Sequence, residues 1–168
     1  GSQELNDKVY SQTKALLDKG KLVGLIGGDH STPYGYIKAL SERHASFGIL
    51  HIDAHCDLRV AYEGFKYSHA SIMYNVMSTT PEVKQLTQVA IRDYCEDEIA
   101  YAESDQRIVQ FPDHLLSERK FEGESWASIC DSIIDSLPEK VYISLDIDGL
   151  SSENCPNPGT PVAGGMTY

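Results

Sequence analysis

Two short runs of the chain place potential metal ligands at alternating positions. The first run reads His-Ile-Asp-Ala-His-Cys-Asp over residues 51–57, and the second reads Ser-Leu-Asp-Ile-Asp over residues 144–148. Because successive side chains of an extended strand point to opposite faces, residues i and i+2 share one face. We therefore expect the acidic and imidazole side chains of each run to converge at a strand end. The converging residues are Asp53, His55 and Asp57 in the first run, and Asp146 and Asp148 in the second.

A sixth potential ligand, His30, lies in the run Gly-Gly-Asp-His-Ser at residues 27–31. This run comes directly after the apolar segment 21–26, so it too follows a predicted strand. Three strand-like segments thus end in ligand-type residues. This pattern predicts a metal site at the carboxyl edge of a sheet.

The charges of these side chains narrow the choice of metal. Four Asp carboxylates and two neutral imidazoles would bring a charge of about −4 into one cleft, which is very unfavourable without cations. Two divalent ions would balance that charge. Oxygen ligands supplemented by imidazole, without thiolate, suit manganese better than calcium or structural zinc. Carboxylates that bridge two ions would hold a hydroxide between them at neutral pH. The alternative is that these aspartates are ordinary turn formers, which three coordinated runs make improbable.

The same three blocks resemble the signature of the ureohydrolases, a family that includes arginase, agmatinase, guanidinobutyrase and formimidoylglutamase. The family pattern is Gly-Gly-Asp-His-Ser, then Asp-Ala-His-x-Asp, then Ser-x-Asp-x-Asp leading to a Gly-Thr-Pro-x-x-Gly-Gly loop. The three blocks stand here in the family's order, and the resemblance extends over residues 21–168. The matching segments are residues 27–31, 53–57, 144–148 and 159–165.

The resemblance implies a cofactor of two Mn²⁺ ions and assigns their ligands. Asp53 and Asp146 match the carboxylates that bridge both ions. The remaining positions match ligands of one ion each. His30 and Asp57 belong to the first ion, and His55 and Asp148 belong to the second.

The resemblance also implies which residues carry catalysis. His69 falls where the family keeps a mobile-loop histidine that shuttles a proton or contacts substrate, although Ala70 follows it where relatives usually have glycine. The implied reaction is attack of the bridging hydroxide on a guanidino or formimidoyl carbon, with Asp148 or His69 passing a proton to the leaving amine.

Two residues next to the ligand positions carry weaker signals. His51 alternates with Asp53 and His55 and could face the site, but no role in the family maps to it. Cys56 alternates away from the ligands and is expected to be a small core residue behind them.

The pattern of apolar segments predicts an α/β protein. Strands separated by helices indicate a three-layer α/β/α arrangement with a mostly parallel sheet, arginase-like, in a single domain over residues 1–168. Family members typically approach twice this length, so the chain looks truncated at both ends, and its activity in this form is an open question. The predicted strands are 22–26, 47–52, 89–92, 107–111 and 141–145, and the predicted helices are 3–19, 33–40, 70–77 and 124–137.

Composition restricts the partners. With 14 basic and 25 acidic residues, for a net charge of −11, the chain lacks the basic surface that nucleic acid requires. No apolar run approaches about 18 residues, so no membrane span is expected. The four cysteines lack the spacing of a zinc ribbon or disulfide framework, which favours a reducing cytoplasm. The partners expected are a small-molecule substrate and further copies of the chain, because family members form trimers or hexamers.

Substrate choice depends on Arg59. Arginases follow the last aspartate of the second block with Ile-Asn, whereas here Leu58 and Arg59 follow Asp57, which argues against arginine. The loop before His69 resembles agmatinases, whose products are urea and an amine. Arg59 in the cleft would instead suit the carboxylates of formimidoylglutamate. A third alternative is a non-catalytic metal-binding or assembly protein with the ureohydrolase fold.

Overall fold

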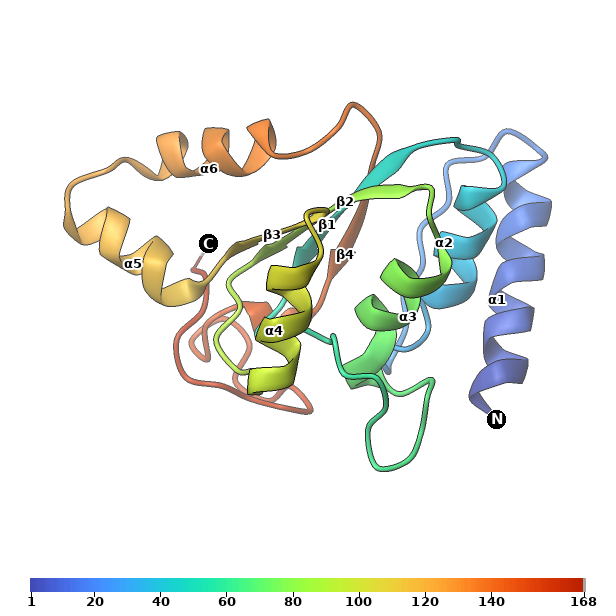
Figure 1. Cartoon of the computed structure of the whole chain (residues 1–168), viewed down its shortest axis with the longest axis horizontal. Coiled ribbons are helices and arrows are strands. Elements are labelled where there is room, and N and C mark those ends of the chain that lie inside the picture. The colour runs from blue at the N-terminus through green and yellow to red at the C-terminus, as the bar shows by residue number, and fades with distance from the viewer. Residues whose placement is uncertain (168) are drawn as a thin grey trace. The chain divides into compact units, whose positions relative to one another are not determined.

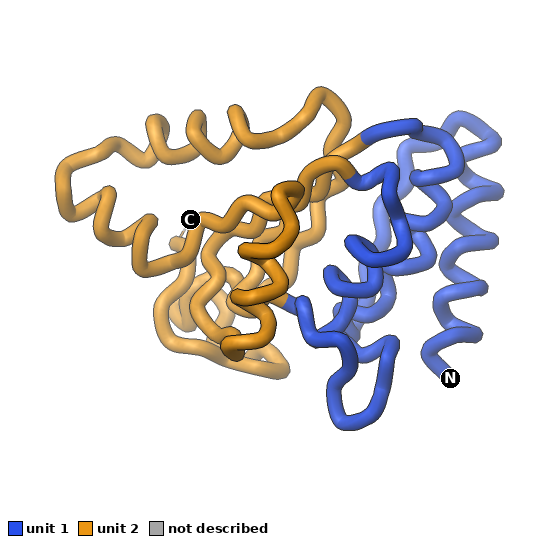
Figure 2. Tube along the Cα trace, in the orientation of Figure 1, with its two compact units in different colours: residues 1–46, 57–83 blue, residues 47–56, 84–168 orange. Residues whose placement is uncertain are grey.

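The computed structural model describes residues 1–167, and Tyr168, the last residue of the predicted domain, lies outside them. The chain divides into two compact units (Figure 2). Unit 1 comprises residues 1–46 and 57–83, and unit 2 comprises residues 47–56 and 84–168. The second ligand block is therefore split, with Asp53 and His55 in unit 2 and Asp57 in unit 1. The single domain predicted from the sequence stays a prediction.

Unit 2 is built on a four-stranded sheet in the order β3-β2-β1-β4 (Figure 1). The pairs β1–β4 and β2–β3 are parallel. In the first pair Ile52 lies opposite Leu145, so the two strands end at the same level and the residues that follow them begin together. The strands are β1 (Phe47–Ile52), β2 (Val83–Val89), β3 (Ile108–Phe111) and β4 (Val141–Leu145).

The connections between these parallel strands are helical, as parallel pairing requires. Helix α4 (Glu96–Ser104) joins β2 to β3, and α5 (Asp113–Phe121) and α6 (Trp126–Asp135) join β3 to β4. The core of unit 2 forms where the last two helices pack on the sheet, and burying each of its large aliphatic side chains contributes roughly 1.5–3 kcal/mol. Its buried residues are Val89, Ala90, Leu116, Ile129 and Ile133.

Unit 1 contains helices and loops. Helices α1 and α2 approach so closely at Gly35 that a Cβ there would lie 2.2 Å from the backbone oxygen of Asn6. Only glycine permits this approach. The helical elements are α1 (Ser2–Leu17), α2 (Tyr34–Ser41), the 3-10 turn η1 (His69–Ser71) and α3 (Ile72–Thr79).

The prediction of a strand at residues 22–26 is wrong. The segment is irregular, and its side chains Leu22 and Ile26 are fully exposed. An apolar run becomes a strand only when its backbone pairs with a neighbour, and within residues 1–167 the segment belongs to no strand ladder. The run is apolar, but no strand in the described part of the chain pairs with its backbone.

Two further predictions need correction. The strand predicted at residues 89–92 lies earlier, because β2 ends at Val89, where Ala90 adopts a φ of +71° that breaks the extended backbone. The sequence pattern also predicts that Trp126, Ile129, Ile133 and Ile134 all face inward from the helix at residues 124–137. In α6, Ile129 and Ile133 are buried as expected, whereas Trp126 and Ile134 are exposed. Only one face of this helix is covered by the sheet.

The α/β class is confirmed by the parallel sheet and its helical connections. Within the described part of the chain, no helix is long and apolar enough to cross a membrane.

Candidate metal centre

Unit 2 brings together three of the predicted ligands. One donor atom each from Asp53, His55 and Asp148 lies within 4.8 Å of the others. The Nδ1 atom of His55 is 3.1 Å from Oδ2 of Asp148 and 3.4 Å from Oδ1 of Asp53. Both carboxylates are nearly completely buried, so two negative charges share a poorly solvated space with one imidazole. This is a donor set that a divalent cation fits.

The sheet positions Asp53 directly after β1. Its Oδ1 accepts a hydrogen bond of 2.7 Å from the backbone N–H of His55, and its Oδ2 lies 2.8 Å from Nε2 of His51. On the other side, Gly149 passes so close that a Cβ would lie 3.0 Å from the backbone nitrogen of Asp53. The carboxylate is thus held on both oxygens, and the backbone behind it is closely packed.

Asp148 enters the same group from the turn that follows β4. This 3-10 turn, η2, spans Ile147–Gly149. The Oδ1 atom of Asp148 accepts from the backbone N–H of Ala54 at 3.1 Å, and Oδ2 accepts from the hydroxyl of Thr160 at 3.0 Å. Thr160 belongs to the Gly-Thr-Pro loop of the sequence motif, so this loop holds a predicted ligand by a side-chain contact.

Asp146, the other ligand predicted after β4, is placed differently. Its side chain caps η2 by accepting a hydrogen bond of 3.1 Å from the backbone N–H of Asp148. Among the described residues it is not part of the clustered donor group of unit 2. Each carboxylate oxygen has two lone pairs, so this cap is compatible with a role for Asp146 as a bridging ligand.

The two buried carboxylates change the protonation of His55. Hydrogen bonds from His55 to Asp148 and then to Asp53 outweigh its partial burial and raise the pKa of His55 to about 10. At neutral pH the imidazolium therefore neutralises part of the carboxylate charge. A metal ion would have to displace that proton, because only the neutral ring can be a ligand.

Arg92 anchors the loops around the group. Its guanidinium donates to the backbone carbonyls of Asp148 at 2.6 Å, Val162 at 3.1 Å and Ala163 at 3.1 Å. The next two residues, Gly164 and Gly165, have φ values of +98° and +95°, which favour glycine. The Gly-Gly end of the third motif thus wraps around this arginine.

Unit 1 brings together the other two predicted ligands. Nδ1 of His30 lies 2.9 Å from Oδ2 of Asp57, and both side chains are largely buried. Asp57 has a φ of +53°, unusual for a residue other than glycine. In this conformation its carbonyl accepts from the backbone N–H groups of Met73 and Tyr74 at 3.0 and 3.2 Å, in the first turn of α3. Asp57 thus provides a predicted ligand carboxylate and also accepts the first backbone N–H groups of α3.

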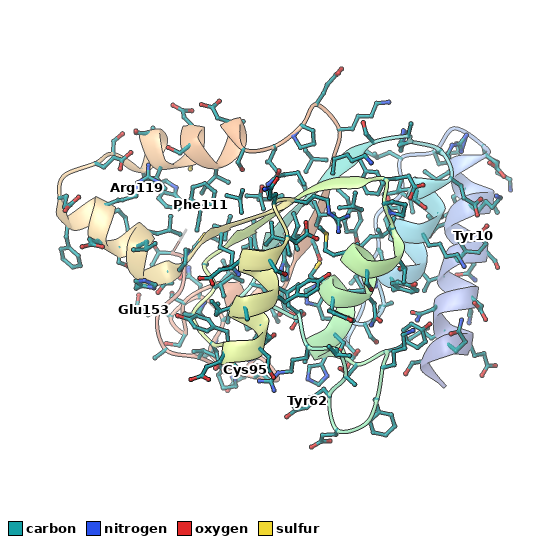
Figure 3. All side chains as sticks on the ribbon, in the orientation of Figure 1. Tyr10, Tyr62, Cys95, Phe111, Arg119 and Glu153 are labelled. Carbon is teal, nitrogen blue, oxygen red and sulfur yellow. The ribbon has the colours of Figure 1, made fainter. Side chains whose placement is uncertain are left out.

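His69, the predicted catalytic histidine, is half exposed in unit 1. Its Nδ1 lies 3.5 Å from Oδ2 of Asp29, and the edge of its ring meets Tyr62, which projects from the loop before η1 (Figure 3). Burial opposes ionisation of Asp29, but hydrogen bonds from Ser31 outweigh it and hold the pKa of Asp29 below its usual value. These four residues help to line an open pocket of about 400 Å³. His69 is thus accessible and faces a carboxylate.

Arg59 is engaged within the same loop. Its guanidinium lies over the ring of Tyr62, 5.4 Å from the centroid, and its backbone N–H donates to the carbonyl of Ala70. A cation on an aromatic face is held by the ring quadrupole. In this conformation Arg59 contacts residues on both sides of the loop that carries His69.

Several residues around the unit 2 group were not predicted from the sequence. Gln88 reaches His51 with a 2.9 Å contact, and Asp93 lies 3.6 Å from Nε2 of His55. Arg92 is the last residue of the segment 89–92 that is predicted as a strand, and Asp93 follows it directly, so a polar pair at the end of that segment was an available signal. Gln88 lies among mixed polar and apolar residues of β2, just before the predicted strand, and gave no such signal. Cys56 is buried behind the site, as expected.

The fold and the site together define a parallel α/β protein with a carboxylate–imidazole group that could hold a metal ion, at the carboxyl ends of two neighbouring strands. The family model described as the arginase family matches residues 1–168. The chain therefore belongs to the arginase family, and the resemblance seen in its motifs is confirmed.

Individual relatives agree with this assignment. The chain is 36% identical to an N(1)-aminopropylagmatine ureohydrolase of Thermus thermophilus over 99% of its own length and 53% of that protein. It is 28% identical to an agmatinase of Bacillus subtilis, over 96% of the chain and 51% of that protein. The arginase structure from Medicago truncatula superposes with a TM-score of 0.83 at 28% identity, over 99% of the chain and 51% of that structure. The chain thus spans about half the length of these relatives.

Proposed function

We propose that this chain belongs to a binuclear manganese hydrolase that cleaves a guanidino compound into urea and an amine, as an agmatinase does. The observation that carries the proposal is the group formed by Asp53, His55 and Asp148 in unit 2. Two of the family's ligand blocks, separated by about ninety residues, meet there as a site for a divalent ion would require.

Each unit holds part of the ligand set that the family pattern implies. Unit 2 offers the three clustered side chains, and unit 1 offers the close pair His30 and Asp57. We assign the second ion's remaining ligand to Asp146, which shares bridging with Asp53 as the family pattern implies. Manganese is favoured because the donors are carboxylates and imidazoles without thiolate.

Divalent ions held by these ligands would supply a hydroxide nucleophile at neutral pH and stabilise charge on the reacting carbon. Side chains of this chain would accept and donate the protons of the reaction. Asp148 is a buried carboxylate already within 3.1 Å of an imidazole nitrogen, so it can accept a proton inside the site. His69 is accessible in its pocket and paired with Asp29, which suits it to deliver a proton to the leaving amine.

The substrate we propose is a guanidino compound with a cationic or neutral tail, agmatine first. The contact of Arg59 with Tyr62 supports this choice, because an arginine used inside its own loop is not presented to the carboxylates of formimidoylglutamate. The names of two relatives support the same choice, since they refer to agmatine or its aminopropyl derivative. We further propose a cytoplasmic homo-oligomer. The four cysteines are free thiols, as in a reducing compartment.

A titration of the protein with Mn²⁺, coupled to measurement of urea release, tests the proposal. The substrates compared would be agmatine, N(1)-aminopropylagmatine, guanidinobutyrate, arginine and formimidoylglutamate. We expect two ions per chain and a preference for the amine-bearing guanidino compounds that persists in Arg59→Ala. Preference for formimidoylglutamate that collapses in Arg59→Ala would show the alternative activity. Tight binding of manganese without turnover of any substrate would show a metal-binding protein that is not a hydrolase.

The variant Asp53→Asn serves as the control for this titration, because it removes the charge of the proposed bridging carboxylate. Both ions should be lost and urea release should cease. Retention of two ions in Asp53→Asn would contradict the ligand assignment.

A further inference from the structure

A row of polar side chains crosses the sheet of unit 2 toward the metal centre. Gln110 on β3, Gln88 on β2 and His51 on β1 occupy three adjacent strands, and Gln88 and Gln110 are paired in register. Gln88 and His51 are completely buried, and the row ends at Asp53, which is 1% exposed. The chemistry of the donors and acceptors determines the direction of each hydrogen bond along this row.

The amide of Gln88 can adopt only one orientation. Its Nε2 donates 2.7 Å to the carbonyl oxygen of Cys56, which can only accept. Its Oε1 receives a hydrogen bond of 2.8 Å from Nε2 of Gln110, which can only donate. A flipped amide would lose both contacts. The second hydrogen on Nε2 of Gln88 therefore points to Nδ1 of His51, 2.9 Å away.

This orientation fixes the proton on His51. Because Nδ1 accepts from Gln88, the ring proton lies on Nε2. That N–H then donates to Oδ2 of Asp53 at 2.8 Å. A nitrogen that carries a proton has no lone pair for a metal ion. The hydrogen bonds thus make His51 a donor to the ligand carboxylate and exclude it as a ligand.

The energetics show that the row is not a generic core feature. Burying amides and imidazoles costs free energy unless every donor and acceptor is paired, and aliphatic side chains of similar volume would fill these positions without that cost. Here each contact is made, in one direction, and the last donor reaches a group proposed to bind metal. A histidine that donates to a carboxylate restricts the rotation of that carboxylate.

We propose that His51, oriented by Gln88 and Gln110, is a positioning residue that fixes the carboxylate of Asp53 for metal binding. Oδ2 is occupied by the imidazole N–H, so the carboxylate plane is set while Oδ1 stays directed toward His55. This inference rests on the proposed function, in which Asp53 is a metal ligand.

The variant Gln88→Met tests the proposal in the whole protein. Methionine has similar length and removes the donor to Nδ1 of His51. We expect the Kd for Mn²⁺, measured by calorimetry, to rise about tenfold to a hundredfold, the usual effect of losing a group that orients a ligand. The number of ions at saturation should not change.

The control variant is Thr87→Val, on the same strand. Thr87 is also completely buried, and its hydroxyl pairs with that of Ser136 at 2.9 Å, away from the row. Both variants remove one buried polar partner, so both can lower the unfolding temperature. Only Gln88→Met should weaken manganese binding. Equal Kd values in Gln88→Met and wild type would overturn the proposal.

Two variants of His51 separate positioning from ligation. His51→Leu should weaken manganese binding, and His51→Gln, which keeps a donor, should restore part of it, with two ions bound in both at saturation. Loss of one ion in His51→Leu and His51→Gln alike would show that His51 is itself a ligand. If Gln88→Met does not fold, Gln110→Met removes the donor to Gln88 more mildly and should give a smaller shift in the same direction.

The proton position can be read without metal. In ¹⁵N spectra of labelled histidine in metal-free protein, His51 should show protonation at Nε2 alone, and Gln88→Met should lose that pattern. A proton on Nδ1 in wild type would overturn the proposal. If wild type bound no manganese, the proposed function would fail, and the positioning role would fail with it, whatever the spectra show.

Discussion

The guanidinium of Arg92 donates a 2.6 Å hydrogen bond to the backbone carbonyl of Asp148, the residue whose carboxylate belongs to the candidate metal centre. The same guanidinium reaches the carbonyls of Val162 and Ala163 in the loop that carries the Gly-Gly pair. One side chain thus connects the turn after β4 to a loop more than ten residues further on. The position of the Asp148 carboxylate depends on this connection.

Arg92→Met should therefore damage both stability and metal binding. Several backbone carbonyls would lose a charged donor, each such bond being worth about 1.5–3 kcal/mol, and water can replace only part of this. We expect a decrease of about 2–4 kcal/mol in the free energy of unfolding, measured with urea in the presence of EDTA. Arg92→Lys should recover little, because one ammonium cannot reach all the carbonyls at once. Full stability in Arg92→Lys would show that a single contact matters.

Gly165→Ala should disturb the same arrangement from the loop side. Position 165 has a φ of +95°, and a Cβ there would lie 2.8 Å from the backbone carbonyl of Leu150 and 2.9 Å from Nη2 of Arg92. We expect a loss of about 1–3 kcal/mol in unfolding free energy, together with weaker manganese binding. The control is Gly159→Ala in the same loop, where no atom lies within 4 Å of the new Cβ. Equal effects at the two positions would argue against the close contact.

Metal binding should depend on pH through His55. Its pKa of about 10 in the metal-free protein means that the bound ion must displace a proton throughout the neutral range. We expect manganese affinity to rise between pH 6.5 and 9 by up to about tenfold per pH unit from this group. Calorimetry in buffers of different ionisation enthalpy would measure the released proton. Affinity that does not change over this range would contradict the raised pKa.

The stability of the metal-free protein should show the opposite trend. The folded-state pKa of His55 lies above its ordinary value of 6.5, so its contribution to stability is complete below pH 6.5 and is lost as the pH rises through 10. Thermal unfolding in EDTA should occur at lower temperature as the pH increases across that window. His55→Gln should remove most of this dependence.

His69→Ala should reduce turnover by about 10²–10⁴-fold while the manganese content stays at two ions, since a positioned acid or base typically contributes that much. Asp29→Asn should reduce turnover by at most about fivefold, because an exposed ion pair is worth about 0.2–1 kcal/mol. The control is His114→Ala, an exposed histidine on α5. Unchanged turnover in His69→Ala would remove this residue from the mechanism.

Parts of the fold with a local cause could be predicted from the sequence. The apolar runs that became β1 and β4 pair in parallel, and their equal register brings Asp53 and Asp148 to one edge, as alternation and strand direction imply. The run at residues 22–26 is also largely apolar, yet it is not a strand. A strand forms only where a second strand pairs with its backbone, and the local sequence pattern does not show whether such a partner is present.

The contacts that orient the site were not predictable in this way. The alternation of residues suggests that His51 could face the site. Which of its ring nitrogens donates a hydrogen bond depends on Gln88 and Gln110, which lie on two other strands. Similarly, the left-handed backbone of Ala90 ends β2, and alanine gives no signal of such a conformation. The sequence motifs predict the ligands, whereas the residues that orient those ligands are seen only in the packed structure.

Asp57 combines two functions in unit 1, and this has a consequence for motion. Its carboxylate holds His30, while its carbonyl receives the first N–H groups of α3. Fraying of that helix end would release the backbone that sets the ligand, and occupancy by a metal ion would in turn resist the fraying. The amides of Met73 and Tyr74 should therefore exchange with deuterium more slowly when manganese is bound, so that the first turn of α3 reports on a metal ion that neither residue contacts.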